Sequence, residues 1–165
     1  MFRKDLFFIV CVSVMLAAIE SPFPSIAGLI LLIFYLKFTG RLYLLENLLA
    51  SLFLALLWVY FAKANYHYSS GFAYVGGVCV FPVIAWGMAL FGISMLLSNF
   101  DMFTESGPLN KIILHSLVFT AGLIIIEYTA YHIFGFKNQA TLKYPPIPVI
   151  NCIHAPRWMQ AMYFL

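Results

Sequence analysis

One carboxylate, Glu127, stands inside an apolar run that extends from Ile112 to Phe136. A run of this length can cross a bilayer as a helix, because about 20 mainly apolar residues are enough. An ionisable side chain at bilayer depth costs about 2.5–3.5 kcal/mol on insertion scales, so it normally faces protein, a partner or a cavity. The sequence therefore predicts a membrane helix with one polar group that is turned away from lipid.

The composition places the whole chain among membrane proteins. Of its 165 residues, 64% are hydrophobic and 9% are charged, whereas a globular domain is about 45–50% apolar and about 25% charged. The net charge of +3 comes from cations that lie beside the apolar runs and form no single basic patch. We therefore expect contact with membrane lipids and no nucleic-acid partner.

The first apolar stretch is interrupted by prolines. Leu6–Ile19 and Ile26–Phe38 flank a segment that contains Pro22 and Pro24. Proline lacks an amide hydrogen and disfavours a helical conformation of the residue before it, so a break is predicted here. Each half rises only about 20 Å as a helix, which is less than the hydrocarbon core of about 30 Å. A thin helical hairpin, which the prolines favour, and one sharply kinked span both stay open.

Three further spans are predicted at Leu42–Ala62, Val75–Leu97 and Lys111–Phe136. The middle one is rich in small residues, and Ala85 and Ala89 have the small-xxx-small spacing that lets helices approach closely. We therefore expect this helix to be the most tightly packed. The Ala85/Ala89 face is also a candidate surface for self-association or for another membrane subunit.

The predicted fold is all-α: a polytopic integral membrane bundle of four to five transmembrane helices over residues 1–136. A Pro-rich polar tail follows over residues 137–165, and its apolar end is too short to span, so it should lie in the interface or re-enter against protein. The distribution of Lys and Arg slightly favours four spans, while the prolines favour five. The expected location is a bacterial inner membrane, with the side of the C-terminus open.

The last span carries the first candidate site. Thr120, Glu127 and Tyr131 are seven and four residues apart and so share one helical face, while His132 stacks with Tyr128 on the adjacent face. A carboxyl group beside a phenol can act as a general acid or base. The alternative is a neutral Glu127 that forms a structural hydrogen bond with a neighbouring helix.

The tail carries the second candidate site, because Asn151, Cys152, His154 and Arg157 lie in one short segment stiffened by prolines. A cysteine thiolate near a base is a candidate nucleophile, and an arginine can hold a phosphate or carboxylate in a bidentate contact. The alternative is an interfacial anchor, with Trp158 in the aromatic belt of the membrane.

The short link after the last span predicts that the tail folds back on the membrane domain. His154 or Arg157 should then approach the end of the span that carries Tyr131 and His132. The candidate catalytic residues are Glu127, Tyr131, His132, Cys152 and His154, and the candidate substrate-binding residues are Thr120, Asn151, Arg157 and Trp158.

Three hypotheses of function follow from this pattern. The first is an intramembrane polar site that binds or transforms an apolar substrate such as a lipid, an isoprenoid or a quinone. The others are an accessory subunit of a larger membrane complex and a proton- or ion-coupled carrier. Three cysteines without paired spacing argue against a disulfide framework or a zinc site. The sequence names no cofactor and leaves open whether the protein is an enzyme.

Overall fold

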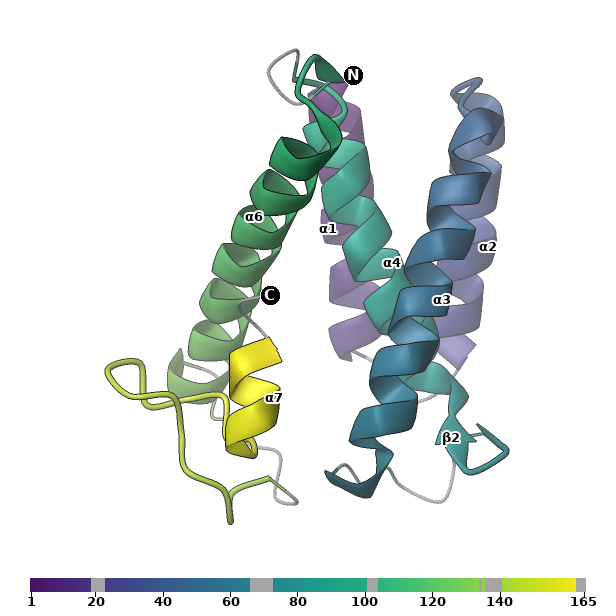
Figure 1. Ribbon diagram of the computed structural model, residues 1–165. Helices are drawn as coiled ribbons and strands as arrows, with labels where there is room; N and C mark the ends of the chain where they lie inside the picture. The colour runs from purple at the N-terminus through teal and green to yellow at the C-terminus, as the bar shows by residue number, and fades with distance from the viewer. Residues whose placement is uncertain (19–22, 66–72, 101–103, 134, 136–140, 163–165) are drawn as a thin grey trace. The chain divides into compact units, whose positions relative to one another are not determined.

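The computed structural model describes residues 1–18, 23–65, 73–100, 104–133, 135 and 141–162. Most of these residues are helical and the strands are two residues long each, which confirms the all-α class (Figure 1). The α-helices are α1 (Phe2–Ala18), α2 (Phe23–Phe38), α3 (Leu45–Ala62), α4 (Val80–Leu97), α6 (Pro108–Tyr128) and α7 (Arg157–Met162). Short elements join them: the helical turns η1 (Leu42–Leu44), η2 (Lys63–Asn65) and η3 (Thr129–Ile133), and the strands β1 (Tyr74–Val75) and β2 (Val78–Cys79).

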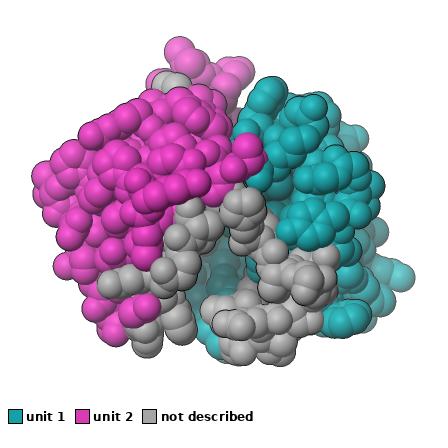
Figure 2. All heavy atoms as spheres, turned by 90° about the horizontal axis from the view of Figure 1, so that it is seen from below, with its two compact units in different colours: residues 1–63, 68–100 teal, residues 64–67, 101–165 magenta. Residues whose placement is uncertain are grey.

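The chain divides into two compact units, which Figure 2 distinguishes by colour. Unit 1 comprises Met1–Lys63 and Tyr68–Phe100, and unit 2 comprises Ala64–His67 and Asp101–Leu165. Unit 2 therefore holds α6 together with the tail. The boundary expected at residue 136 lies inside this unit.

Three helical segments among the described residues are long and apolar enough to cross a bilayer: Leu42–Asn65, Val80–Leu97 and Pro108–Ile133. They are compatible with a membrane protein. The helices α1 and α2 have 17 and 16 residues and so rise only about 25 Å, short of a hydrocarbon core of about 30 Å.

The first two helices of unit 1 form an antiparallel pair. Asp5, near the start of α1, bonds to Tyr35 near the end of α2 and to Arg41 just beyond it. The predicted break over 19–22 lies outside the described residues. Pro24 lies in the first turn of α2, where the N–H that proline lacks would form no helical hydrogen bond. Of the two arrangements that the sequence left open, the structure has the hairpin.

The helix α4 is the centre of unit 1, because it contacts α1, α2 and α3. Each of the three candidate spans contains an apolar stretch of 18 residues. The share of that stretch that is buried is 44% for α4, 28% for α3 and 11% for α6. Of these three helices, α4 thus has the largest buried share, while the expectation that it is the most tightly packed helix stays a prediction. Its core side chains pack against α2, η1 and α3, and the cluster comprises Leu32, Leu36, Leu44, Leu48, Met88, Phe91 and Met95.

The close approach of α4 to α3 is made at Gly87. A Cβ atom there would lie 2.6 Å from Cδ2 of Leu52 and 3.0 Å from its Cα, so only glycine fits without a shift. The small-residue pair predicted from the sequence does not make this contact, since Ala89 is exposed and Ala85 is half-buried.

The helix α4 begins at Val80, not at Val75 as expected from the apolar run. The residues before it form a hairpin in which Tyr74 pairs with Cys79 and Val75 with Val78. The two turn residues, Gly76 and Gly77, have φ of 56° and 76°. A two-residue turn of this kind needs positive φ at both positions, which glycine adopts without strain.

Candidate functional site

His154 ties the tail of unit 2 to the end of α6. Its Nε2 lies 3.2 Å from the Tyr131 hydroxyl, and its Nδ1 lies 2.8 Å from the carbonyl oxygen of Tyr144. The rings of Tyr131 and His154 are stacked with centroids 5.5 Å apart. Because a carbonyl oxygen only accepts, Nδ1 carries a proton, and in the neutral ring Nε2 accepts from the Tyr131 hydroxyl. The expected approach of His154 to the last span is present.

His132 makes a second connection between α6 and the tail. Its Nε2 lies 3.0 Å from the carbonyl oxygen of Ile150 and so donates to it. Its ring contacts that of Tyr128, with centroids 4.6 Å apart, as expected from their spacing of four residues. Both contacts involve η3, a π-helical turn that continues α6. Such turns are rare and frequently occur at functional sites.

The tail segment 147–153, which lies next to both histidine contacts, is a tight, strained turn. The Ile147 N–H donates to the Cys152 carbonyl oxygen at 3.0 Å, and the Asn151 N–H donates to the Ile147 carbonyl oxygen at 3.1 Å. Three residues have positive φ: Val149 at 77°, Asn151 at 48° and Ile153 at 57°. Asparagine tolerates this region, whereas a β-branched residue there is strained, by about 1–3 kcal/mol.

Cys152 is fully buried within this turn. Burial raises the pKa of its thiol, and the negative charge of the nearby Glu127 raises it further. The thiol form therefore dominates at neutral pH, and a buried neutral thiol is a poor nucleophile. Glu127 itself is half-buried on α6, and no hydrogen bond joins its carboxylate to a described residue.

The remaining candidates are Arg157, Asn151, Trp158 and Thr120. Arg157 is exposed at the start of α7, where its Nη1 donates to Oε1 of Gln160 at 3.2 Å. Gln160 is buried and donates to the carbonyl oxygens of Pro145 and Ala155 at 2.6 and 3.0 Å. Gln160, which the sequence did not single out, thus holds α7 against the tail. The side chains of Asn151 and Trp158 are exposed, and Thr120 is half-buried on α6.

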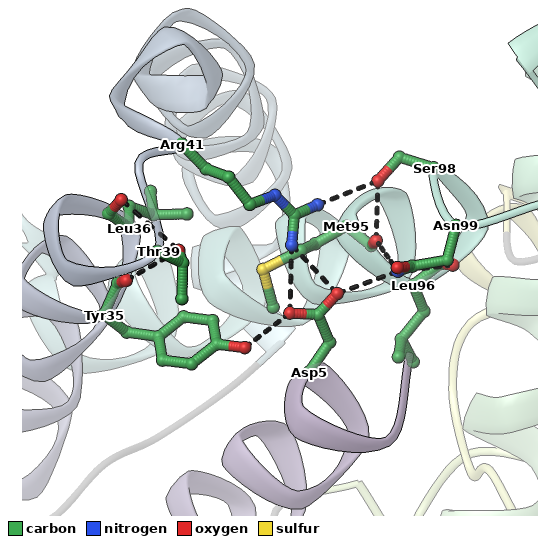
Figure 3. A network of polar contacts seen from close by, with 9 residues as sticks. All are labelled: Asp5, Tyr35, Leu36, Thr39, Arg41, Met95, Leu96, Ser98 and Asn99. Atoms are coloured by element: carbon green, nitrogen blue, oxygen red, sulfur yellow. Dashed lines mark hydrogen bonds and ion pairs between the residues drawn. The ribbon is translucent and has the colours of Figure 1, made fainter. Parts of the chain in front are cut away.

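Unit 1 contains a polar network that the sequence did not indicate (Figure 3). Asp5 is 0% exposed, and both of its carboxylate oxygens accept hydrogen bonds. Tyr35 donates to Oδ1 at 2.6 Å, Arg41 Nη1 donates to Oδ1 and Oδ2 at 2.9 Å each, and Asn99 Nδ2 donates to Oδ2 at 2.8 Å. The other guanidinium nitrogen of Arg41 donates to Ser98 at 3.0 Å.

This network joins the start of α1, the chain after α2 and the end of α4. Every oxygen of the Asp5 carboxylate has protein partners, and the charge of Arg41 balances it at 2.9 Å. A saturated buried ion pair of this kind fixes one arrangement of the chain and leaves no lone pair for a ligand. We assign the network to the architecture of unit 1, and the candidate functional site to unit 2.

No group of three or more His, Cys, Asp or Glu side chains that could hold a metal ion occurs in the part of the chain that the structure describes. Comparison of the chain with protein-family models, with curated proteins and with solved structures finds no match.

Proposed function

We propose that the protein is a small integral membrane protein that binds an apolar ligand with a polar head at the end of α6, beneath the tail. A lipid, an isoprenoid or a quinone has the required chemistry. The observation that carries the proposal is the Tyr131–His154 pair, held on its far side by the Tyr144 carbonyl oxygen. It is a donor and acceptor pair at the end of an apolar helix.

The pair suits a polar head that carries an oxygen. The Tyr131 hydroxyl can leave His154 and donate to a carbonyl or hydroxyl oxygen of the ligand, and the freed Nε2 can accept a proton. Because the Tyr144 carbonyl oxygen holds the Nδ1 proton, the ring keeps its orientation while Nε2 changes partner. Glu127, one turn before Tyr131 on α6, supplies a further ionisable group.

The apolar part of the ligand would lie along α6. Ile125 and Ile126, beside Glu127, are each 66% exposed, and such side chains suit contact with a hydrocarbon chain. His132 positions the tail through Ile150. Thr120, Asn151, Arg157 and Trp158 are further proposed ligand contacts, and substitution of each by alanine should lower ligand retention.

A second candidate function is that of an accessory subunit in a larger membrane complex. It is favoured by the low burial of α6, of whose apolar stretch only 11% is buried. Such a helix needs cover from lipid or from a helix of another protein.

Extraction of the purified protein with organic solvent, followed by mass spectrometry and an absorption spectrum, tests the first proposal. We expect the unmodified protein to retain a defined lipid or chromophore, and His154→Ala and Tyr131→Phe to lose it. Tyr144→Phe is the matched control, because its hydroxyl bonds to Asn65 and only its backbone holds His154. Equal retention by all variants would contradict the proposal, and other subunits in fixed proportion would support the second function.

A further inference from the structure

Unit 1 has an apolar groove between α1 and α4. Its walls include Phe8, Ile9 and Val12 from α1, and Ala85, Ala89 and Gly92 from α4. The small residues of α4 leave the space that larger side chains would fill. Ala89 is exposed, so the groove is accessible from outside.

The groove approaches the Asp5 network at one end. Phe8 and Ile9 lie one helical turn after Asp5 on α1, and the groove residue Met95 offers its carbonyl oxygen to Ser98 and Asn99. We call this end of unit 1, where α1 begins and where α2 and α4 end, the basic end.

The basic end carries an excess of exposed positive charge. Arg3, Lys4 and Lys37 are exposed there, and among the described residues of unit 1 the exposed anion is Glu46. Arg41 does not add to the excess, because Asp5 neutralises it. Lys4 and Phe8 are four residues apart and so share a face of α1, which puts a cation above the wall of the groove.

We propose that the groove and the basic end together bind one anionic phospholipid. Its acyl chain lies in the groove and its phosphate contacts the exposed cations, chiefly Lys4. Charge complementarity selects the occupant. The groove is lined mainly by apolar side chains, with the hydroxyl-bearing Ser13 among them, while the adjacent cations attract an anionic headgroup. This site lies in unit 1 and is independent of the ligand proposed for unit 2.

Native mass spectrometry of the purified protein in detergent tests the proposal, with phosphatidylglycerol or phosphatidylcholine of the same chains added in equal amounts. We expect one phosphatidylglycerol to bind more tightly than phosphatidylcholine. Lys4→Gln should weaken it about fivefold, and the joint loss of Arg3, Lys4 and Lys37 should weaken it by about two orders of magnitude.

Matched controls separate the groove from general effects. Ala89→Leu fills the groove and should also abolish the bound lipid, whereas Ala50→Leu changes an exposed alanine on α3 outside it. Lys63→Gln removes a cation at the other end of α3 and should leave phosphatidylglycerol binding unchanged. Equal binding of the two lipids, or unchanged binding in Lys4→Gln or Ala89→Leu while the melting temperature is retained, would overturn the proposal.

Discussion

The two units differ in how a carboxylate is buried and hydrogen-bonded. In unit 1, Asp5 is fully buried and each of its oxygens has protein donors, including the Arg41 guanidinium at 2.9 Å. In unit 2, Glu127 is half-buried and forms no hydrogen bond with a described residue. A saturated carboxylate fixes a fold, while one with free acceptor capacity can take a ligand or a proton.

The comparison predicts its largest effect at Asp5. Asp5→Asn keeps the shape of the side chain but leaves Arg41 buried without its counter-charge. Breaking a buried ion pair in this way costs about 3–5 kcal/mol of stability. We expect a matching loss in the free energy of unfolding, measured by denaturant titration in detergent. Glu127→Gln should change stability by much less.

A double-mutant cycle checks the cause. Asp5→Asn combined with Arg41→Gln removes both charges and should recover part of the loss, because no uncompensated charge is left. If the two losses simply add, the pair is not coupled and the contrast between the units fails.

Packing around α4 gives the next largest effect. Gly87→Ala should destabilise unit 1 by about 1–3 kcal/mol, because its Cβ would lie 3.0 Å from the backbone of Leu52. Gly92→Ala is the matched control. Its Cβ would meet Ile9 at 3.4 Å, an ordinary contact, so the higher helix propensity of alanine should stabilise the protein by up to about 1 kcal/mol. Thermal unfolding of both variants measures the difference, and equal shifts would remove the argument.

The features of unit 1 that the sequence predicted are local ones. The prolines at 22 and 24 indicate two short helices, and the length of the apolar runs indicates the spans. The pair of Asp5 and Arg41 is separated by 36 positions, and no local pattern links them. Asp5 directly follows Arg3 and Lys4, which reads as the charged flank of a first membrane helix. Only the antiparallel packing of α1 and α2 brings the two side chains together.

Unit 2 was predictable in outline because chain length constrains it. The short link after the last span predicts that the tail returns to it, and His154 does contact Tyr131. The conformation of the turn was not predictable, since positive φ at Val149 and Ile153 contradicts the preference of β-branched residues. Tertiary contacts override that preference here. The roles of the site residues stay predictions.

In the candidate site, we expect a moderate effect on stability and a large one on binding. Tyr131→Phe removes the hydrogen bond to His154. Such a bond is worth about 0.5–1.5 kcal/mol, so the protein should stay folded while ligand retention is lost. The loss in the free energy of unfolding should be smaller for Tyr131→Phe than for Asp5→Asn in the same assay. A loss of stability as large as that of Asp5→Asn would make Tyr131 an architectural residue and contradict its role in binding.

The smallest expected effect concerns the two buried thiols, Cys79 in unit 1 and Cys152 in unit 2. Burial raises the pKa of both from the ordinary value of 9.0. The folded protein therefore keeps a proton that the unfolded chain releases. This contribution to stability is full below pH 9 and is lost as the pH rises through the pKa of the folded state.

Because the charge of Glu127 adds to burial at Cys152 only, Cys152→Ala should flatten the decline in stability above pH 9 more than Cys79→Ala does. Unfolding titrations from pH 7 to 10 measure this slope, and Glu127→Gln should reduce the difference between the two cysteine variants. If Glu127→Gln leaves that difference unchanged, the carboxylate has no electrostatic link to the tail.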